Sequence, residues 1–162
     1  MNILFLGDVM GKSGRQVVRK ELPELKRKLE IDTVILNGEN AAGGFGITPK
    51  ICEEFYELGV NVITTGNHVW DQKEIIPYIS KDPNLLRPHN FPSNVPGQGF
   101  IIYKDSMNRK VLVINVMARL FMDPLNDPFE SIENIISNYK IREEVNAIVI
   151  DIHGEATSEK MA

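Results

Sequence analysis

The sequence contains a single cysteine, Cys52, and only three histidines. One thiol cannot form an internal disulfide, and it cannot build a thiolate metal site. Cys52 lies among apolar residues at helical spacing, including Ile51 and Phe55, so we expect it to pack in the core as most free cysteines do. This leaves oxygen and imidazole groups as the ligands available to a metal ion.

Long apolar runs and a concentration of positive charge are also missing. No apolar run approaches the roughly 18 residues of a transmembrane helix, and residues 1–6 are too short for the apolar core of a signal peptide. We therefore expect a cytoplasmic protein without a membrane partner. The net charge of −4 carries no Lys/Arg stripe, so duplex nucleic acid is not an expected partner and a phosphate group must be captured locally.

What the chain does contain is the composition of an ordinary globular protein. Of its 162 residues 43% are hydrophobic and 25% are charged, without repeats or low-complexity segments. A chain of this size is expected to form one domain, covering residues 1–162.

Short apolar runs alternate with amphipathic segments in the first half of the chain. The apolar runs at residues 2–6, 33–36 and 60–64 predict strands buried on both faces, with the first of them a central strand. Apolar residues at three- and four-residue steps predict a helix over 17–29 that contains Pro23. The alternation predicts a largely parallel sheet covered by helices.

Capping signals predict two further helices in this half. Thr48 and Pro49 provide a hydroxyl cap and a proline suited to the first turn of a helix over 49–58. Asp71 with Glu74 three residues later predicts a capping box and a helix that begins at Asp71.

The second half of the chain has a different pattern. Residues 100–103 and 110–116 flank a polar turn and predict a β-hairpin, followed by a helix over 131–139 and a buried strand over 147–152. We therefore expect an α/β fold in which two packed mixed β-sheets are flanked by helices.

Potential metal ligands follow three of the expected strands. The dipeptide Gly7-Asp8 and the tripeptides Gly38-Glu39-Asn40 and Gly66-Asn67-His68 come directly after them, and His153 follows the last strand. Ligand sites in α/β sheets lie at the carboxyl ends of strands, so these side chains can meet in one crevice. The alternatives are an N-cap for Asp8, turn chemistry for Glu39-Asn40, and structural roles for His68 and for His89, which lies in a proline-rich loop.

A shared crevice would require cations. Two carboxylates about 4 Å apart, as Asp8 and Glu39 would be, repel each other by roughly 4 kcal/mol at a surface-like dielectric. A pair of divalent ions offsets this repulsion and promotes attack on a phosphoryl centre. Mixed oxygen and imidazole ligands favour manganese, iron or zinc over calcium.

Five segments in order resemble the YmdB-like bacterial phosphodiesterases of the calcineurin-like metallophosphoesterase superfamily, which act on 2′,3′-cyclic nucleotides. The segments are LFLGDVMGKSGR, NGENAAGGFGIT, TTGNHVWDQKEI, LLRPHNFP and HGEATSEK.

The resemblance implies a role for each matching residue. It implies that Asp8, Glu39, Asn40, Asn67 and His153 are ligands of a dinuclear metal site, with Glu39 bridging the two ions. His68 would be the general acid for the departing ribose oxygen, and a metal-bound hydroxide would attack a small phosphodiester such as a cyclic nucleotide. Arg15 is a weaker candidate for a phosphate contact, with a surface role equally open.

The family pattern continues beyond the last residue of this sequence, with a Gly-Thr-His-Thr-His-like segment whose two histidines complete the metal site. We therefore expect a chain truncated at its C-terminal side, holding about three-fifths of the family's domain. The alternative function is a catalytically impaired fragment that binds metal or nucleotide. An unfinished sheet would leave an exposed edge through which copies of the chain could associate.

Overall fold

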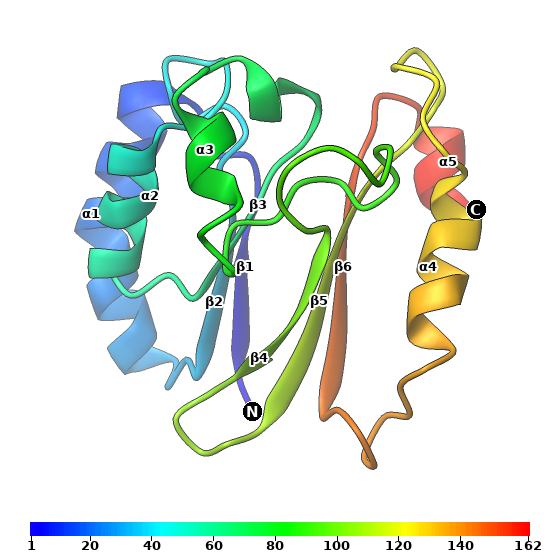
Figure 1. Ribbon diagram of the computed structural model, residues 1–162. Coiled ribbons are helices and arrows are strands. Elements are labelled where there is room, and N and C mark those ends of the chain that lie inside the picture. Colours follow the sequence, from blue (N-terminus) through cyan, green and yellow to red (C-terminus); the bar gives the residue numbers. More distant parts are fainter.

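The computed structural model describes all 162 residues and shows four layers, with two three-stranded sheets packed face to face and helices on the outer face of each (Figure 1). This confirms the expected fold class. The elements in chain order are β1 (Ile3–Leu6), α1 (Gly11–Lys28), β2 (Thr33–Asn37), α2 (Pro49–Glu57), β3 (Val62–Thr64), a 3₁₀ helix (Asn67–Trp70), α3 (Ile75–Ile79), β4 (Phe100–Lys104), β5 (Lys110–Met117), α4 (Pro128–Ile136), β6 (Ala147–His153) and α5 (Thr157–Met161).

The first sheet is parallel throughout, in the order β1-β2-β3. All five residues of β2 are buried, as its apolar run predicts. The prediction that the first strand is central is wrong, because β1 lies at the edge and Phe5 is 41% exposed. A short apolar run cannot distinguish a central strand from an edge strand, because an edge strand whose face is covered by helices is also apolar.

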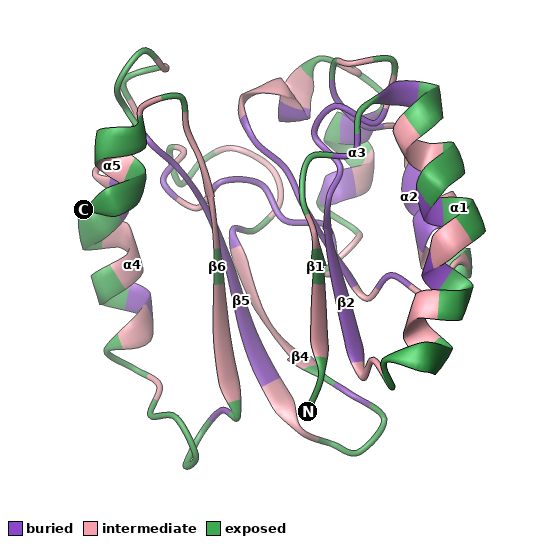
Figure 2. Cartoon of the chain, turned by 180° about the vertical axis from the view of Figure 1, so that it is seen from behind, coloured by how far each residue is buried: buried purple, intermediate pink, exposed green.

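The second sheet is mixed, in the order β4-β5-β6. β4 and β5 form the predicted antiparallel hairpin, and β6 pairs with β5 in parallel, with His153 opposite Met117. Figure 2 shows that the central strands β2 and β5 are buried along most of their length, whereas β1 and β6 are less buried. The second sheet therefore leaves β6 unpaired along one side.

Three apolar cores separate the four layers, because alternate residues of each strand face opposite sides. One core lies between the first sheet and its helices, and it includes Val34, Leu36, Ile63 and Phe55. A second core lies between the sheets and contains Ile35, Val62, Leu86, Val111 and Val113. A third core joins the second sheet to α4 through Leu112, Ile114, Val116, Ile135 and Val145.

The helices before β3 agree with the sequence patterns. α1 begins at Gly11, earlier than the apolar spacing indicates, and includes Pro23 without ending there. α2 begins at Pro49, and the Thr48 side chain accepts a hydrogen bond from the Ile51 amide, as predicted. None of the helices combines the length and the apolar composition required to cross a bilayer.

The predicted helix start at Asp71 is wrong. Asn67–Trp70 forms a 3₁₀ helix, α3 begins only at Ile75, and Glu74 makes no capping bond through its side chain. The Asp71 carboxylate instead contacts His68, as described below. Later in the chain, α4 starts three residues before the predicted position because Asp127 accepts hydrogen bonds from the first-turn amides of Phe129 and Glu130.

Candidate functional site

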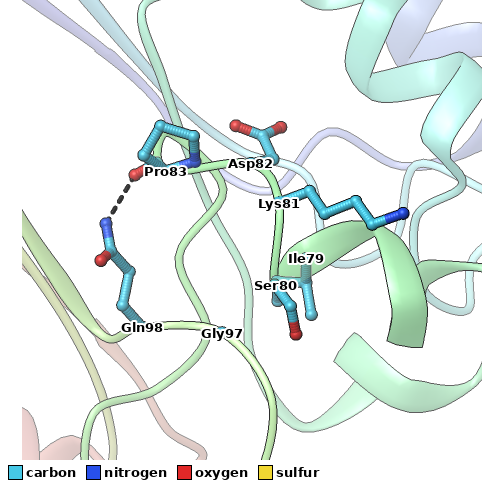
Figure 3. Close-up of a pocket in the computed structure, with 7 residues that line it drawn as sticks. All are labelled: Ile79, Ser80, Lys81, Asp82, Pro83, Gly97 and Gln98. Carbon is cyan, nitrogen blue, oxygen red and sulfur yellow. Dashed lines mark hydrogen bonds between the residues drawn. The ribbon is translucent and has the colours of Figure 1, made fainter.

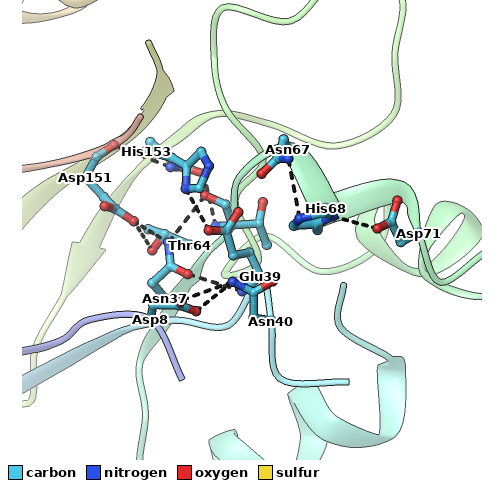
Figure 4. A network of polar contacts seen from close by, with 12 residues as sticks. Asp8, Asn37, Glu39, Asn40, Thr64, Asn67, His68, Asp71, Asp151 and His153 are labelled. Carbon is cyan, nitrogen blue, oxygen red and sulfur yellow. Dashed lines mark hydrogen bonds and ion pairs between the residues drawn. The ribbon is translucent and has the colours of Figure 1, made fainter. Parts of the chain in front are cut away.

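The carboxyl ends of the three parallel strands meet at one edge of the first sheet. The segments after β1, β2 and β3 carry Asp8, Glu39 with Asn40, and Asn67 with His68. The last residue of β6, His153, reaches the same place from the second sheet, and Figure 4 shows these side chains grouped together. The structure thus brings four strand ends to one location.

Glu39 and His153 form the most buried contact of the group. The His153 Nδ1 atom lies 2.6 Å from Glu39 Oε1, and Glu39 is 2% exposed. The other two polar atoms of this pair, Glu39 Oε2 and His153 Nε2, are buried and have no hydrogen-bond partner. Buried polar groups are rarely left without a partner, so these two atoms indicate a place for a further group.

The electrostatics of His153 reflect the acidic groups around it. Burial of the ring lowers its pKa, but the hydrogen bond and charge of Glu39, helped by Asp151 and Glu155, outweigh burial and raise the pKa above its ordinary value. A cation placed beside the ring would neutralise the same carboxylates that the proton on His153 neutralises here.

Asp8 and Asn40 form a second pair. The Asn40 side-chain amide donates to both carboxylate oxygens of Asp8, at 3.0 Å each, and Asn40 is buried. The backbone reinforces this contact, because the Gly11 amide at the start of α1 donates to the Asn40 carbonyl at 2.9 Å. The loop after β2 is thereby tied to the loop after β1.

Gly66 is the residue that lets the strand ends approach so closely. A Cβ atom at this position would overlap Glu39 Oε2 and would lie 2.7 Å from Cγ of His153. Gly7 differs, because a Cβ atom there would meet nothing within 4 Å. Of these two glycines before predicted site residues, only Gly66 is required by close packing.

His68 has its own set of partners. Its Nδ1 atom lies 2.7 Å from Asp71 Oδ2, and its Nε2 atom lies 3.4 Å from the side-chain Nδ2 atom of Asn67. The ring also makes a perpendicular contact with Phe45, with 5.1 Å between ring centroids. Asp71 was not predicted as a site residue, because its spacing to Glu74 resembles a capping box, although a carboxylate three residues after a histidine is also a signal for this contact.

A polar network beneath the site joins the two sheets. The Asp151 carboxylate of β6 accepts hydrogen bonds from Asn37 Nδ2 at 2.9 Å and Thr64 Oγ1 at 2.5 Å (Figure 4). Nearby, Asn115 Oδ1 accepts from the Thr65 amide at 3.1 Å. Asp151 was not predicted as a site residue, because its partners lie far away along the chain.

The cavity at this location is acidic. It has a volume of about 380 Å³, and its lining includes the carboxylates of Asp8, Glu39, Asp151 and Glu155 but only one lysine, Lys160. An anionic phosphodiester would be repelled by these groups unless cations were present.

The carboxylate, amide and imidazole groups are of the kinds that bind metal ions, but no three His, Cys, Asp or Glu side chains gather around one point. Instead, the side chains form two separate pairs, Asp8 with Asn40 and Glu39 with His153. Glu39 Oε2 and His153 Nε2 have no hydrogen-bond partner. A histidine that uses one ring nitrogen to contact a carboxylate and keeps the other free has the arrangement typical of metal-ligating histidines.

Arg15 does not belong to this group. Its guanidinium lies 3.0 Å from Glu54 of α2, and it lines a separate small cavity with Lys12, Gln16 and Arg19. The expected phosphate contact is therefore not supported by the geometry, because the Glu54 carboxylate holds the side chain between α1 and α2.

The other two residues considered from the sequence are structural. His89 lies outside the acidic cavity, and its ring packs against Phe100 with 5.4 Å between centroids. Cys52 is fully buried, and burial raises the pKa of its thiol, which makes it unreactive.

A larger cavity, of about 500 Å³, lies elsewhere on the molecule (Figure 3). It is lined by α3 and loop residues, among them Lys81, Asp82 and Gln98, and by none of the predicted site residues. Its only carboxylate, Asp82, already accepts hydrogen bonds from the Tyr56 hydroxyl and the Asn84 amide. Its size alone gives it no evident chemistry.

Comparison with known proteins gives consistent matches. The chain is 46% identical to a 2′,3′-cyclic-nucleotide 2′-phosphodiesterase of Bacillus subtilis over 162 residues, which are 100% of this chain and 60% of the relative. A crystal structure of a hypothetical protein from Thermus thermophilus superposes with a TM-score of 0.90 at 38% identity, covering 99% of this chain and 61% of that one. The crystal structure of a novel phosphatase from Mycoplasma pneumoniae superposes with a TM-score of 0.87 at 34% identity, covering 98% of this chain and 57% of that one.

These matches include the strand ends described above, and the chain spans about three-fifths of the length of these relatives. The model of the family described as YmdB-like protein matches residues 4–162, which contain every residue of the acidic cavity. With that match over nearly its whole length, the chain belongs to the YmdB-like family.

Proposed function

We propose that this chain carries the catalytic site of a metal-dependent phosphodiesterase that hydrolyses 2′,3′-cyclic nucleotides or similar small phosphodiesters. The observation that carries the proposal is the buried Glu39–His153 pair with its two unpartnered atoms, in an acidic cavity at the strand ends that also present His68. The name of the Bacillus subtilis relative supports the substrate class.

The residues that would hold two divalent ions are Asp8, Glu39, Asn40, Asn67 and His153. Manganese or iron suits this mixture of carboxylate, amide and imidazole donors. Glu39 has one oxygen against His153 and one free, so it is the carboxylate best placed to serve two ions. When bound, the ions would neutralise the charge of the phosphate and lower the pKa of the attacking water.

His68 is suited to protonate the departing oxygen. Asp71 contacts Nδ1 and so fixes the orientation of the ring. The Asn67 Nδ2 group is a donor, so Nε2 accepts in the contact seen here, and Nε2 can give up a proton once the Asn67 amide has turned away and the ring is doubly protonated. The Asp71 carboxylate also balances the charge of the ring when both nitrogens are protonated, as in other carboxylate–histidine pairs. Asp71 is therefore a positioning residue in this proposal.

The test is hydrolysis of a 2′,3′-cyclic nucleotide and of bis-p-nitrophenyl phosphate in the presence of manganese. We expect His68→Ala to lower kcat by about 10²- to 10⁴-fold, the usual contribution of a general acid. The bound manganese, measured by elemental analysis, should be unchanged in this variant. Asp71→Asn should cause a smaller loss and change the pH profile of kcat.

The Bacillus subtilis relative, assayed in the same buffer, is the positive control. The absence of turnover by the wild-type chain with manganese bound would contradict the proposal. If wild type and His68→Ala hydrolyse the substrate at equal rates, the proposed hydrolysis stands, but His68 is not the general acid.

A further inference from the structure

Phe45 is a large aromatic residue that remains 60% exposed beside the proposed general acid. Its ring is perpendicular to that of His68, at 84°, with 5.1 Å between centroids. A perpendicular contact with one small ring covers at most one face of a phenyl group. Single exposed apolar side chains are common on protein surfaces, so the exposure alone marks no site. The position beside His68 is what makes the free part of this ring available to a ligand in the site.

The loop that presents Phe45 is fixed by its backbone. Gly43, Gly44 and Gly46 all have positive φ values, of 74°, 101° and 78°. A side chain at Gly46 would meet the His68 carbonyl at 2.9 Å, so this glycine also allows the loop to pack against the segment that carries His68. Phe45 is thus placed by a conformation that other residues rarely adopt.

Hydrogen bonds hold the same loop on both sides of Phe45. The Ala42 amide donates to the Gly46 carbonyl at 2.9 Å, and the Gly44 amide donates to the Asn40 carbonyl at 2.9 Å. Gln72 Nε2, one residue after Asp71, donates to the carbonyl of Phe45 itself at 2.7 Å. The aromatic ring is therefore tied both to the Asn40 loop and to the His68–Asp71 segment.

The position next to His68 determines which part of a substrate would meet Phe45. If His68 protonates the departing oxygen of a nucleoside 2′,3′-cyclic phosphate, the ribose that carries this oxygen lies against His68. The base is attached to the neighbouring carbon of the same ribose, so it extends only a few ångströms beyond it. An exposed phenyl ring at this distance offers a flat apolar surface to the base.

Resting on the proposed function, we propose that Phe45 is the base-stacking residue of this site and that its substrates carry a nucleobase on the ribose next to the scissile bond. Stacking needs only the π-face of a base, so Phe45 accepts all four bases and favours the larger purines. Phe45 therefore selects nucleotides over phosphodiesters that lack a base.

The test compares two phosphates that differ only in the base. Adenosine 3′-monophosphate and methyl β-D-ribofuranoside 3-phosphate are titrated into the 162-residue chain with manganese by isothermal calorimetry. We expect the wild type to bind the adenosine compound about tenfold more tightly or better. Phe45→Ala should remove this difference and leave the affinity for the ribofuranoside phosphate unchanged, whereas Phe45→Trp should preserve it.

Two further measurements separate stacking from a general disturbance. Phe129→Ala changes another partly exposed phenylalanine, on α4, and should leave both affinities unchanged. Nuclear Overhauser contacts between adenine protons and labelled phenylalanine rings should appear in the wild type and disappear in Phe45→Ala.

The failures are distinguishable. If the wild type binds both phosphates equally, or if Phe45→Ala weakens both to the same extent, Phe45 does not stack on the base and the proposed function still stands. If the wild type binds neither phosphate with manganese present, the proposed function fails and this inference fails with it.

Discussion

The two sheets contribute to the site in different ways. The parallel first sheet provides the loops that carry Asp8, Glu39, Asn40, Asn67 and His68, whereas the mixed second sheet provides only His153 of the proposed ligands. In the first sheet all three strands point the same way, so their carboxyl ends lie together and several loops can share one place. In the second sheet only β5 and β6 run in parallel, and β4 points away.

The difference shows that the first sheet supplies the chemical groups and that the second sheet must be held in place against it. Two sets of polar contacts do this at opposite ends of the sandwich. Near the site, Asp151 of β6 accepts from Asn37 and Thr64. At the far end, Arg109 in the β4–β5 turn contacts Asp32 in the loop before β2. Each set can be removed separately.

The largest effect is expected from Gly66→Ala, which fills the space beside the contact between Glu39 of the first sheet's loop and His153 of the second sheet. The added methyl group would overlap Glu39 Oε2 and crowd His153, so the contact between Glu39 and His153 should be lost. We expect a loss of about 1–3 kcal/mol in the free energy of unfolding, as for other overpacked positions. Manganese affinity, measured by calorimetry, should fall about 10- to 100-fold because the proposed ligands lose their mutual orientation.

Gly7→Ala is the matched control, because a Cβ atom there has open space. It should change the free energy of unfolding by less than about 0.5 kcal/mol. Equal manganese affinity in the two variants would show that the second sheet does not shape the site.

A smaller effect is expected from Asp151→Ala, which removes the acceptor shared by Asn37 and Thr64. Two buried donors lose their partner, and we expect urea unfolding to show a loss of about 1–2 kcal/mol. Asp151→Asn keeps one oxygen acceptor and should lose less. Glu155→Ala removes a carboxylate of the same cavity that makes no hydrogen bond through its side chain, and an equal loss in that variant would count against the inter-sheet role.

The smallest effect concerns the far end, where acid should weaken the contact. The Asn2 amide, and then Arg109, hold the pKa of Asp32 below its ordinary value of 3.8. Burial alone would raise the pKa of Asp105, but hydrogen bonds from the backbone and side chain of Arg109 and from the Met107 amide outweigh it and lower the pKa. Because both pKa values are lower in the folded state, these carboxylates stabilise the fold above about pH 4, and this contribution is lost as the pH falls through their folded-state pKa values.

Thermal unfolding at several pH values tests this contact. Arg109→Gln should lower the Tm at neutral pH by a few degrees and should show a shallower fall in Tm between about pH 5 and pH 3 than the wild type. Lys110→Gln removes the same charge without an ion pair, so it should keep the wild-type slope. Parallel slopes for wild type and Arg109→Gln would mean that Arg109 does not set these pKa values.

Residues whose roles depend on neighbours in the chain could be predicted from the sequence. The apolar runs that end in glycine located the loops of the first sheet, and Thr48 located the start of α2. The spacing of apolar residues also gave the hairpin and the final strand that carries His153.

Residues with distant partners could not be predicted where no strand end marked their position. Asp151 meets Asn37 at a separation of 114 positions, and Arg15 is held by Glu54 at a separation of 39. The role of Asp71 was predicted wrongly for another reason. Its local sequence fits both a helix cap and a histidine partner, and only the three-dimensional position of His68 decides between the two roles.

The alternation of side chains along β6 has a consequence for variation in length. Asp151 and His153 lie two residues apart and face the first sheet, while Ile148 and Ile152 face α4. A single residue inserted between α4 and β6 that shifted the strand by one place against β5 would exchange these two sets. The isoleucines would then face the polar network between the two sheets, and His153 would face α4. Length changes upstream of this strand are therefore tolerable only where a loop absorbs them and the phase of the strand is kept.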